Sequence, residues 1–575
     1  MLRYFAFCLF LCALFSCRES GVVADAVFYN GNIYTLDSLQ PQAEAVAVKN
    51  GKILKAGATE EILKYASEST KKIDLKGKFM MPGFIEGHGH FSGLGKSLMQ
   101  LNFLKSKSWE EIVAQVEKAA AAAKPGEWIE GRGWHQEKWD STPVVNVQGY
   151  PHHHALSDRS PYNPIVLRHA SGHSLFANAA AMQLAGISAE TPDPKGGKII
   201  RDGKGNAIGV FEERAMDLIL GAYESYLKTL TKEQLTERWL KGVELAQQEC
   251  LKKGITSFQD AGVSPGSDFF SSSEEIQMFK KLAETGKLQI RLWAMLRENS
   301  GTLESILENF PIINAGDGYF TCRAIKSEID GALGSYGAWL LEPYNDKPGF
   351  SGQNTTDLEE IKKIAALAIK HKMQLCVHAI GDRGNREVLN LFEEVFKKYE
   401  VQNDHRWRIE HAQHLNPDDI KRMKSLNVIA SMQGIHCTSD APFVVKRLGE
   451  KRAREGAYNW RALLDAGCLI ANGTDAPVED VDPIPNLYAS VTRRRTDSGL
   501  EFFPDQSMNR REAIQSYTLS NAFAAFEEKQ KGSISPGKWA DFVVLSQNIF
   551  DCSAEELLKT KVLMTIVGGN VKFEK

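Results

Sequence analysis

The sequence has no excess of basic residues. Its 575 residues include 69 Lys and Arg against 72 Asp and Glu, which gives a formal net charge of −3 at pH 7. A nucleic-acid-binding surface needs a concentration of positive charge. The one basic cluster, Arg493-Arg494-Arg495, is interpreted as a solvated helix face or an internal salt-bridge partner. We therefore expect no nucleic-acid partner.

Paired cysteines are also missing. Of nine cysteines, three lie before residue 18, and the other six are scattered with no two at CxxC spacing. A disulfide framework or a cysteine-rich zinc site would show regular pairs. We expect these six residues to be buried small apolar side chains or free thiols.

Long hydrophobic runs are absent except at the N-terminus. The apolar run from Tyr4 to Phe15 is too short to span a bilayer as a mature helix, so it is typical of a secretory signal. Leu14-Phe15-Ser16-Cys17 resembles a bacterial lipobox. The resemblance implies a signal peptide over 1–17, a lipid on Cys17 and anchoring to a membrane of the cell envelope. The alternative is a soluble periplasmic or secreted protein, and a homodimer is left open.

The two ends of the chain share a pattern of short strands broken by Gly and Asn. It occupies 24–80 and returns in 531–575. Neither part is large enough to close a core alone. We expect the two parts to form one small β-sandwich, with 81–530 as a separate domain between them.

Within 81–530, β-branched apolar runs alternate with helical segments, which favours a parallel sheet or barrel. Counting the run before His88, there are eight such runs, the number that closes a (β/α)8 TIM-like barrel. The others are 255–260, 290–295, 323–330, 374–378, 408–411, 428–433 and 468–475. The stretch 94–254 is too long for a crossover. We expect it to be an insertion over the active site that shapes the substrate pocket.

Ionisable residues recur at the ends of these runs. His88 and His90 are two positions apart, so in a strand both imidazoles lie on one face. The others are Lys326, His378, His411 and Asp475. Catalytic groups of barrel enzymes lie at the carboxyl ends of the strands. Four histidines and a carboxylate at this position suit zinc or a similar first-row ion.

Lys326 does not fit as an ammonium, because a positive charge is repelled from a cationic site. Either it lies outside the ligand shell, or it is salt-bridged within the barrel, for instance to Glu328 or Asp330. The third alternative is carbamylation of its amine, which creates a carboxylate able to bridge two metals.

Six longer motifs, four of which contain predicted ligands, together resemble the amidohydrolase superfamily, in particular its Amidohydrolase 3 (YtcJ-like) branch. They are Pro82-Gly83-Phe84-Ile85-Glu86-Gly87-His88-Gly89-His90, Gly131-Arg132-Gly133-Trp134, Ile329-Asp330-Gly331-Ala332-Leu333-Gly334-Ser335, His378-Ala379-Ile380-Gly381-Asp382-Arg383, Ile409-Glu410-His411-Ala412-Gln413 and Gly473-Thr474-Asp475-Ala476-Pro477. The resemblance covers nearly everything after the leader. It implies a hydrolase of carbon–nitrogen bonds other than peptide bonds, acting on a small amide-like molecule.

The resemblance also implies roles. His88, His90 and Asp475 would hold one metal, and carbamylated Lys326 would bridge to a second held by His378 and His411. Both metals would be zinc, with other first-row ions as the alternative. A metal-activated hydroxide would attack the carbonyl, and Asp475 would pass its proton to the leaving amine. Alternatives are a mononuclear esterase or deaminase with unmodified Lys326, or a non-catalytic surface lipoprotein that binds a ligand.

Four further residues are predicted to contact the substrate. Gln433 and His436 belong to the seventh-strand segment Gln433-Gly434-Ile435-His436, where a side chain could stabilise the tetrahedral anion. His173 and Trp134 belong to the insertion and could reach the pocket from there, although each has a structural role as its alternative.

Overall fold

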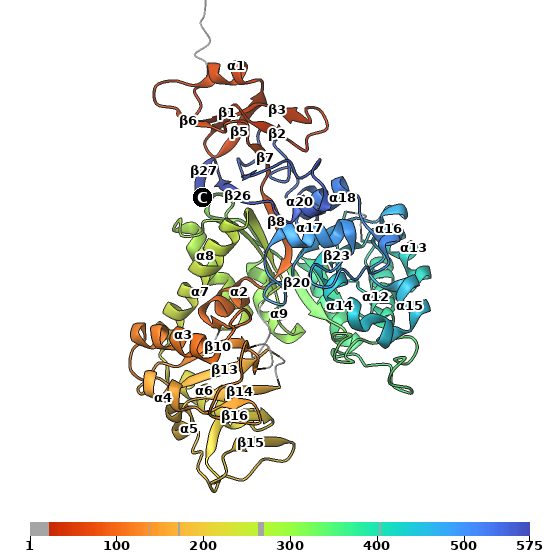
Figure 1. The fold of residues 1–575 in the computed structure, drawn as a ribbon. Coiled ribbons are helices and arrows are strands. Elements are labelled where there is room, and N and C mark those ends of the chain that lie inside the picture. Colours follow the sequence, from red (N-terminus) through yellow and green to blue (C-terminus); the bar gives the residue numbers. More distant parts are fainter. Residues whose placement is uncertain (1–21, 137–138, 171–172, 263–269, 402–403) are drawn as a thin grey trace, which may run out of the picture.

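The computed structural model describes residues 22–575 except 137–138, 171–172, 263–269 and 402–403 (Figure 1). The predicted signal peptide and Cys17 lie outside the described residues. Within the described part, no helix is long and apolar enough to cross a membrane. The six cysteines there are all unpaired, and only Cys552 is partly exposed.

The centre of the molecule is a parallel sheet of eight strands in the order β24-β23-β22-β21-β20-β18-β17-β8, which confirms the predicted barrel strands. The strands are β8 (Phe84–Gly89), β17 (Ile255–Asp260), β18 (Arg291–Leu296), β20 (Phe320–Glu328), β21 (Gln374–Ala379), β22 (Arg408–His411), β23 (Ile429–Gln433) and β24 (Ile470–Gly473). All seven neighbouring pairs are parallel. Their carboxyl ends therefore meet at one end of the barrel.

A buried asparagine joins the two edge strands, β8 and β24. The Asn521 Nδ2 donates to the carbonyl oxygens of Ile85 and Asn472, each at 2.7 Å. Its Oδ1 accepts the backbone N–H of Asn472 at 3.1 Å. Since Ile85 lies in β8 and Asn472 in β24, this one side chain brings the edges of the sheet together.

Replacing Asn521 with Ala should lower the free energy of unfolding by about 3 kcal/mol, because two buried carbonyls lose their donor. Chemical denaturation checks this. Asn354→Ala is the matched control, since Asn354 is exposed and its side chain donates to the carbonyl of Thr356 nearby. Equal unfolding midpoints for the two variants would contradict the bridging role.

The crossover helices pack on the barrel through one apolar stripe each. In α12 (Asp382–Lys398) the buried residues include Val388, Leu391 and Val395, spaced three and four apart. Capping boxes fix the starts of α7 (Lys232–Lys252) and α8 (Ser272–Glu284). The stripes and the outer faces of the strands belong to one large hydrophobic cluster.

The two chain ends meet in a pair of sheets. One has the order β5-β4-β1-β6 and the other β27-β26-β25-β7-β2-β3. Their strands are β1 (Ala26–Tyr29), β2 (Asn32–Tyr34), β3 (Gln42–Ala43), β4 (Ala45–Lys49), β5 (Lys52–Gly57), β6 (Lys71–Asp74), β7 (Phe79–Pro82), β25 (Phe542–Leu545), β26 (Val562–Val567) and β27 (Asn570–Glu574). Strand β7 pairs with β25, so N- and C-terminal segments share one sheet. One hydrophobic cluster spans both sheets, with the rings of Phe28 and Phe542 5.7 Å apart.

The segment between β8 and β17 carries a sheet of its own, in the order β15-β16-β14-β13-β10-β9. Its strands are β9 (Leu101–Asn102), β10 (Ile129–Trp134), β13 (Ile165–His169), β14 (Ser174–Ala177), β15 (Gly197–Arg201) and β16 (Ala207–Glu213). Helix α2 (Phe91–Met99) leads into it from His90. In Figure 1 this sheet lies at the opposite end of the molecule from the sheets of the chain ends.

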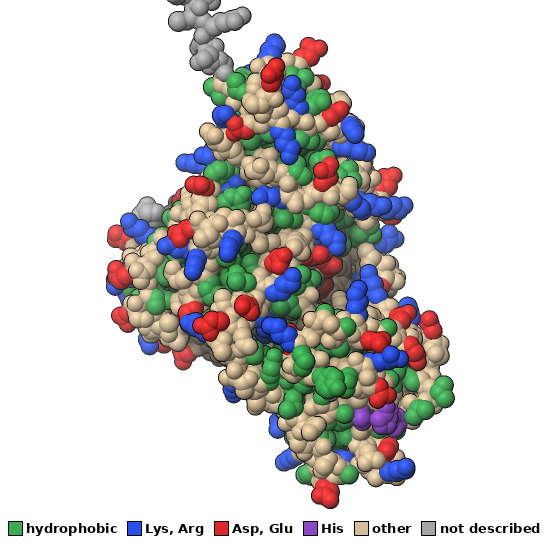
Figure 2. All heavy atoms as spheres, turned by 90° about the vertical axis from the view of Figure 1, so that its left-hand side faces the viewer, with side chains coloured by type: hydrophobic (Ala, Val, Ile, Leu, Met, Phe, Trp, Pro, Cys, Tyr) green, Lys and Arg blue, Asp and Glu red, His purple; other side chains and the backbone are tan. Residues whose placement is uncertain are grey.

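The surface is mixed in charge. Figure 2 shows Lys and Arg interspersed with Asp and Glu over the face drawn, without an extended region of one sign. This distribution agrees with the formal net charge of −3.

Candidate metal centre

The structure brings the predicted histidines and Asp475 together at the carboxyl ends of the barrel strands. Ring centroids of His88 and His411 are 4.8 Å apart, and those of His378 and His411 are 4.4 Å apart. The Asp475 Oδ1 lies 3.3 Å from His90 Nε2 and 3.6 Å from His88 Nε2. Residues separated by almost 400 positions thus form one cluster.

Acceptors behind three of the imidazoles set their orientation. The Nδ1 of His88 lies 2.5 Å from Glu410 Oε2, that of His90 lies 2.9 Å from the Gly262 carbonyl, and that of His411 lies 2.8 Å from Gln433 Oε1. An Nδ1 facing an acceptor carries the proton, which leaves Nε2 with its lone pair free. These contacts therefore prepare three Nε2 atoms as ligands.

The atoms facing the centre of this cluster fit a divalent metal. His88 Nε2, His436 Nε2 and Asp475 Oδ1 are all buried and have no hydrogen-bond partner. Buried polar atoms are normally satisfied, so three orphaned ligand atoms in one place need an explanation. The donor atoms of His88, His90 and Asp475 all lie within 4.8 Å of one another, and so do those of His411, His436 and Asp475. Imidazole and carboxylate donors suit zinc and similar ions.

The protonation states agree with this chemistry. Burial and the nearby His88 together lower the pKa of His411 to about 3, although the charge of Asp475 opposes this shift. Burial also lowers the pKa of His88 and holds that of His378 well below its usual value. Burial alone would raise the pKa of Asp475, but its contacts with His90 and His88 hold that pKa well below its usual range. Neutral imidazoles and an ionised carboxylate are the forms that bind metal.

Lys326 lies in β20 and is 3% exposed. Burial lowers the pKa of its amine, and the positive charge of Arg297 acts in the same direction, while Glu410 opposes both. Glu328, one predicted salt-bridge partner, is instead paired with Arg297. The other, Asp330, accepts the backbone N–H groups of Ile380 and Gly381.

Gln433 and His436 lie closer to the ligands than the sequence suggested. Gln433 is buried and contacts His411, so its side chain orients a ligand. The His436 ring is nearly parallel to that of His411, at 10° and 6.2 Å. Its Nδ1 lies 3.1 Å from Gln413 Nε2, and it belongs to one of the two donor groups. The structure therefore gives His436 a place among the potential ligands.

The two insertion residues lie elsewhere. Trp134 is fully buried in a hydrophobic cluster of the insertion, where its Nε1 donates to the Leu167 carbonyl at 2.8 Å. This is the environment of a core side chain. The side chain of His173 is 72% exposed, and its Nδ1 lies 3.1 Å from Glu213. Neither is part of the histidine cluster.

Glu410 is a site residue that the strand pattern missed. In a regular strand Glu410 and His411 would point to opposite faces. The backbone of His411 instead has φ of 74°, and Asp475 has φ of 59°. These left-handed conformations break the alternation, so both Glu410 and His411 reach the centre. The sequence signal for Glu410 was its place in the motif Ile409-Glu410-His411-Ala412-Gln413.

Replacing Glu410 with Gln should weaken metal binding about 10- to 100-fold, because a neutral amide holds the His88 imidazole less well than a carboxylate. Competition with a chelator measures the dissociation constant. Glu394→Gln is the control, since that side chain is 57% exposed and pairs with Lys362. Unchanged metal affinity in the Glu410 variant would show that this carboxylate does not support the ligand.

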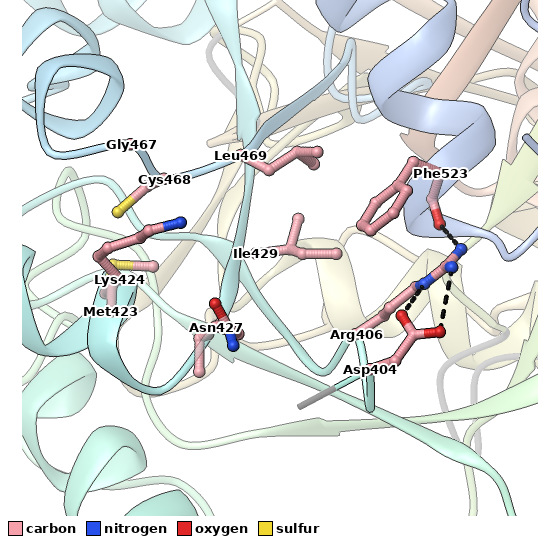
Figure 3. Close-up of a pocket in the computed structure, with 11 residues that line it drawn as sticks. Asp404, Arg406, Met423, Lys424, Asn427, Ile429, Gly467, Cys468, Leu469 and Phe523 are labelled. Atoms are coloured by element: carbon pink, nitrogen blue, oxygen red, sulfur yellow. Dashed lines mark hydrogen bonds and ion pairs between the residues drawn. The ribbon is translucent and has the colours of Figure 1, made fainter. Parts of the chain in front are cut away.

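A cavity of about 390 Å³ lies at the other end of the barrel, where β22, β23 and β24 begin. Figure 3 shows apolar side chains of Ile429, Leu469 and Phe523 on one side of it, and Arg406 paired with Asp404. Catalytic groups of such barrels lie at the carboxyl ends of the strands. We therefore assign this cavity no part in the reaction.

Comparison with known proteins identifies the family. The amidohydrolase family model matches residues 71–573. The putative amidohydrolase YtcJ of Bacillus subtilis (strain 168) is 32% identical over 555 residues, which cover 96% of this chain and 99% of that protein. The N-substituted formamide deformylase of Arthrobacter pascens is 27% identical over 566 residues, 96% of this chain and 98% of the relative.

A solved structure has a similar fold. The crystal structure of an uncharacterized metal-dependent hydrolase from Pyrococcus horikoshii OT3 has a TM-score of 0.71 and 26% identity, covering 92% of this chain and 99% of that one. The family match spans the barrel, β6 and β7 before it, and the C-terminal strands. The chain therefore belongs to the amidohydrolase family.

Proposed function

We propose that this protein hydrolyses a carbon–nitrogen bond, other than a peptide bond, in a small amide-like molecule. The observation that carries the proposal is the position of Asp475, whose ionised carboxylate lies among imidazoles with orphaned Nε2 atoms. The relative that is a deformylase of N-substituted formamides supports this substrate class.

The residues present would hold zinc or another first-row ion. His88, His90 and Asp475 would hold one ion, and His411 with His378 or His436 a second, with carbamylated Lys326 between them. A divalent metal bound there supplies a Lewis acid that polarises a carbonyl and makes water more acidic.

The chain itself moves the proton. Asp475 is ionised, so a carboxylate oxygen can accept a proton from the attacking water. The same oxygen can then return that proton to the leaving nitrogen, which departs as an amine. Glu410 and Gln433 keep His88 and His411 in fixed orientations during this transfer. Burial excludes bulk water as a competing proton acceptor.

A substrate panel tests the reaction. Zinc-loaded protein is incubated with N-substituted formamides, other amides, carbamates, esters and aminopurines, and the products are identified by mass spectrometry. We expect an amine and a carboxylic acid from at least one amide. Turnover of esters alone, or release of ammonia from a ring, would contradict the proposed bond type.

The bridging role of Lys326 has a separate test. Elemental analysis should find two metal ions per wild-type chain and at most one in Lys326→Ala, because the bridging carboxylate is lost. Lys424→Ala is the control, since that lysine lines the cavity at the opposite end of the barrel. Equal metal content in wild type and Lys326→Ala would rule out the bridge.

We also propose that the two sheets of the chain ends act as one β-sandwich and that 94–254 covers the barrel mouth. The shared hydrophobic cluster and the position of the segment after β8 support this. Hydrogen exchange should show the two end sheets opening together. Independent exchange of the two sheets would contradict one domain.

For localisation we propose a lipid anchor on Cys17, supported by the lipobox resemblance. Mass spectrometry of the mature N-terminus should find a diacylglyceryl group on that cysteine. A free amino terminus at another residue would exclude the anchor and favour the soluble exported form.

A further inference from the structure

Two arginines lie side by side on the sheet of the segment between β8 and β17. Arg132 in β10 and Arg168 in β13 are direct register partners in a parallel strand pair, and both are exposed. Neighbouring strands are about 4.8 Å apart, and register partners point to the same face. Two positive side chains are thus placed next to each other.

Neither guanidinium has an acidic partner among the residues that the structure describes. The nearby carboxylates are already engaged. Glu130, two residues before Arg132, pairs with Arg238 and also accepts the Tyr223 hydroxyl. On β16, which β14 separates from β13, Glu212 accepts the hydroxyl of Tyr150, and Glu213 pairs with His173.

An unpaired like-charge pair in register costs stability. A charged residue of a sheet usually has an opposite charge beside it, as Glu130 in β10 has Arg238 of helix α7. Within the described part of the chain, no carboxylate pairs with Arg132 or Arg168. This suggests that the compensating negative charge comes from a ligand.

A third donor flanks the pair. Asn102 in β9 is the register partner of Arg132 on its other side, and it is exposed. Its Oδ1 accepts the backbone N–H of Leu104 at 3.1 Å, which leaves the Nδ2 hydrogens as donors. The row across the sheet therefore presents N–H donors from three adjacent strands.

We propose that Arg132 and Arg168, with Asn102 beside them, bind an oxyanion such as a carboxylate or phosphate group. Planar guanidinium groups donate paired hydrogen bonds that match the oxygens of both anions. The three residues lie on β9, β10 and β13 of the separate sheet, and none is in the two donor groups of the metal centre. The binding proposal does not depend on the proposed hydrolysis.

Calorimetric titration with inorganic phosphate at low ionic strength tests the site. Replacing either arginine with Gln should weaken phosphate binding about 10- to 100-fold, the loss of one charge-assisted contact. Arg214→Gln is the matched control, because Arg214 is exposed on the same segment but outside the three-strand row. Equal phosphate affinity in wild type, Arg132→Gln and Arg168→Gln would overturn the proposal.

Thermal unfolding gives a second readout that a purely structural role would not reproduce. Without phosphate, Arg132→Gln should melt no lower than wild type, because a repulsion is removed. Phosphate should raise the melting temperature of wild type and of Arg214→Gln but not that of Arg132→Gln. The same phosphate-induced rise in all three proteins would also overturn the site.

Steady-state kinetics can identify the source of the anion. The two substrates compared are an amide with a distal carboxylate and its neutral analogue. If the anion belongs to the substrate, Arg132→Gln should raise KM for the carboxylated amide alone, with kcat unchanged. If it is a separate ligand, KM should not change for either substrate, while the loss of phosphate binding persists. Both results support the oxyanion site.

Discussion

Asp475→Asn should lower kcat about a thousandfold or more on any amide that the wild-type protein hydrolyses. The carboxylate is proposed to accept the proton of the attacking water and to deliver it to the leaving nitrogen. A side-chain amide cannot do this, and general acid–base catalysis contributes about 10²- to 10⁴-fold. Steady-state kinetics measure the loss, and elemental analysis of the same sample shows whether metal is retained.

The pH profile separates proton transfer from metal binding. In wild type the acidic limb of kcat should reflect protonation of Asp475, whose pKa lies well below its usual range. With metal retained, the Asn variant should lose this limb. Asp480→Asn, five residues away and 71% exposed, should behave as wild type. Substantial activity of metal-loaded Asp475→Asn would contradict the proposed role.

Gly473→Ala should destabilise the barrel by several kcal/mol and disrupt the metal centre. A Cβ at residue 473 would lie 2.3 Å from Glu86 Oε1 and 2.5 Å from the backbone nitrogen of His88. Contacts this short force β24 away from β8, and overpacking in a filled core costs about 1–3 kcal/mol or more. The change would also disturb the Asp475 N–H, which donates to the His88 carbonyl at 2.8 Å.

Denaturant unfolding and metal titration check the result. The control is Gly203→Ala, because an added Cβ there meets no atom within 4 Å and the glycine has no positive φ. That variant should unfold as wild type does. Wild-type stability of Gly473→Ala would mean that β8 and β24 are not packed as tightly as these distances indicate.

The fold could largely be predicted because parallel strands buried on both faces are near-continuous apolar runs. Each of the eight runs became a barrel strand, although β20 begins at Phe320, three residues before the predicted start. The extra residues pair with β18 and β19 (Ile312–Asn314). Strand boundaries depend on such partners, which local sequence does not contain.

The metal centre was only partly predictable. The sequence placed five candidate ligands at the ends of predicted strands: His88, His90, His378, His411 and Asp475. In the structure these residues do converge. The contacts that orient these ligands could not be predicted from the sequence. Glu410 reaches His88 because the His411 backbone is left-handed, and Gln433 reaches His411 across neighbouring strands.

Arg493, outside the metal centre, is another residue whose contacts the sequence did not predict. Its cluster was interpreted as a solvated face or a salt-bridge partner, but Arg493 is fully buried. It donates to the backbone carbonyls of Phe502 and Tyr458 and lies over the Trp460 ring. Carbonyl groups exposed by a turn are invisible in a sequence, so the hydrogen-bonding role of this arginine needed the folded chain.

The sequence by itself determined the barrel, the strand ends at which the ligands lie and the resemblance to the family, because hydrophobic periodicity and ligand spacing are local properties. Tertiary structure decided which atoms face one another. It placed His436 among the ligands, Trp134 in a core and Arg132 beside Arg168. Register between strands distant in the chain fixes these contacts, and no local pattern specifies it.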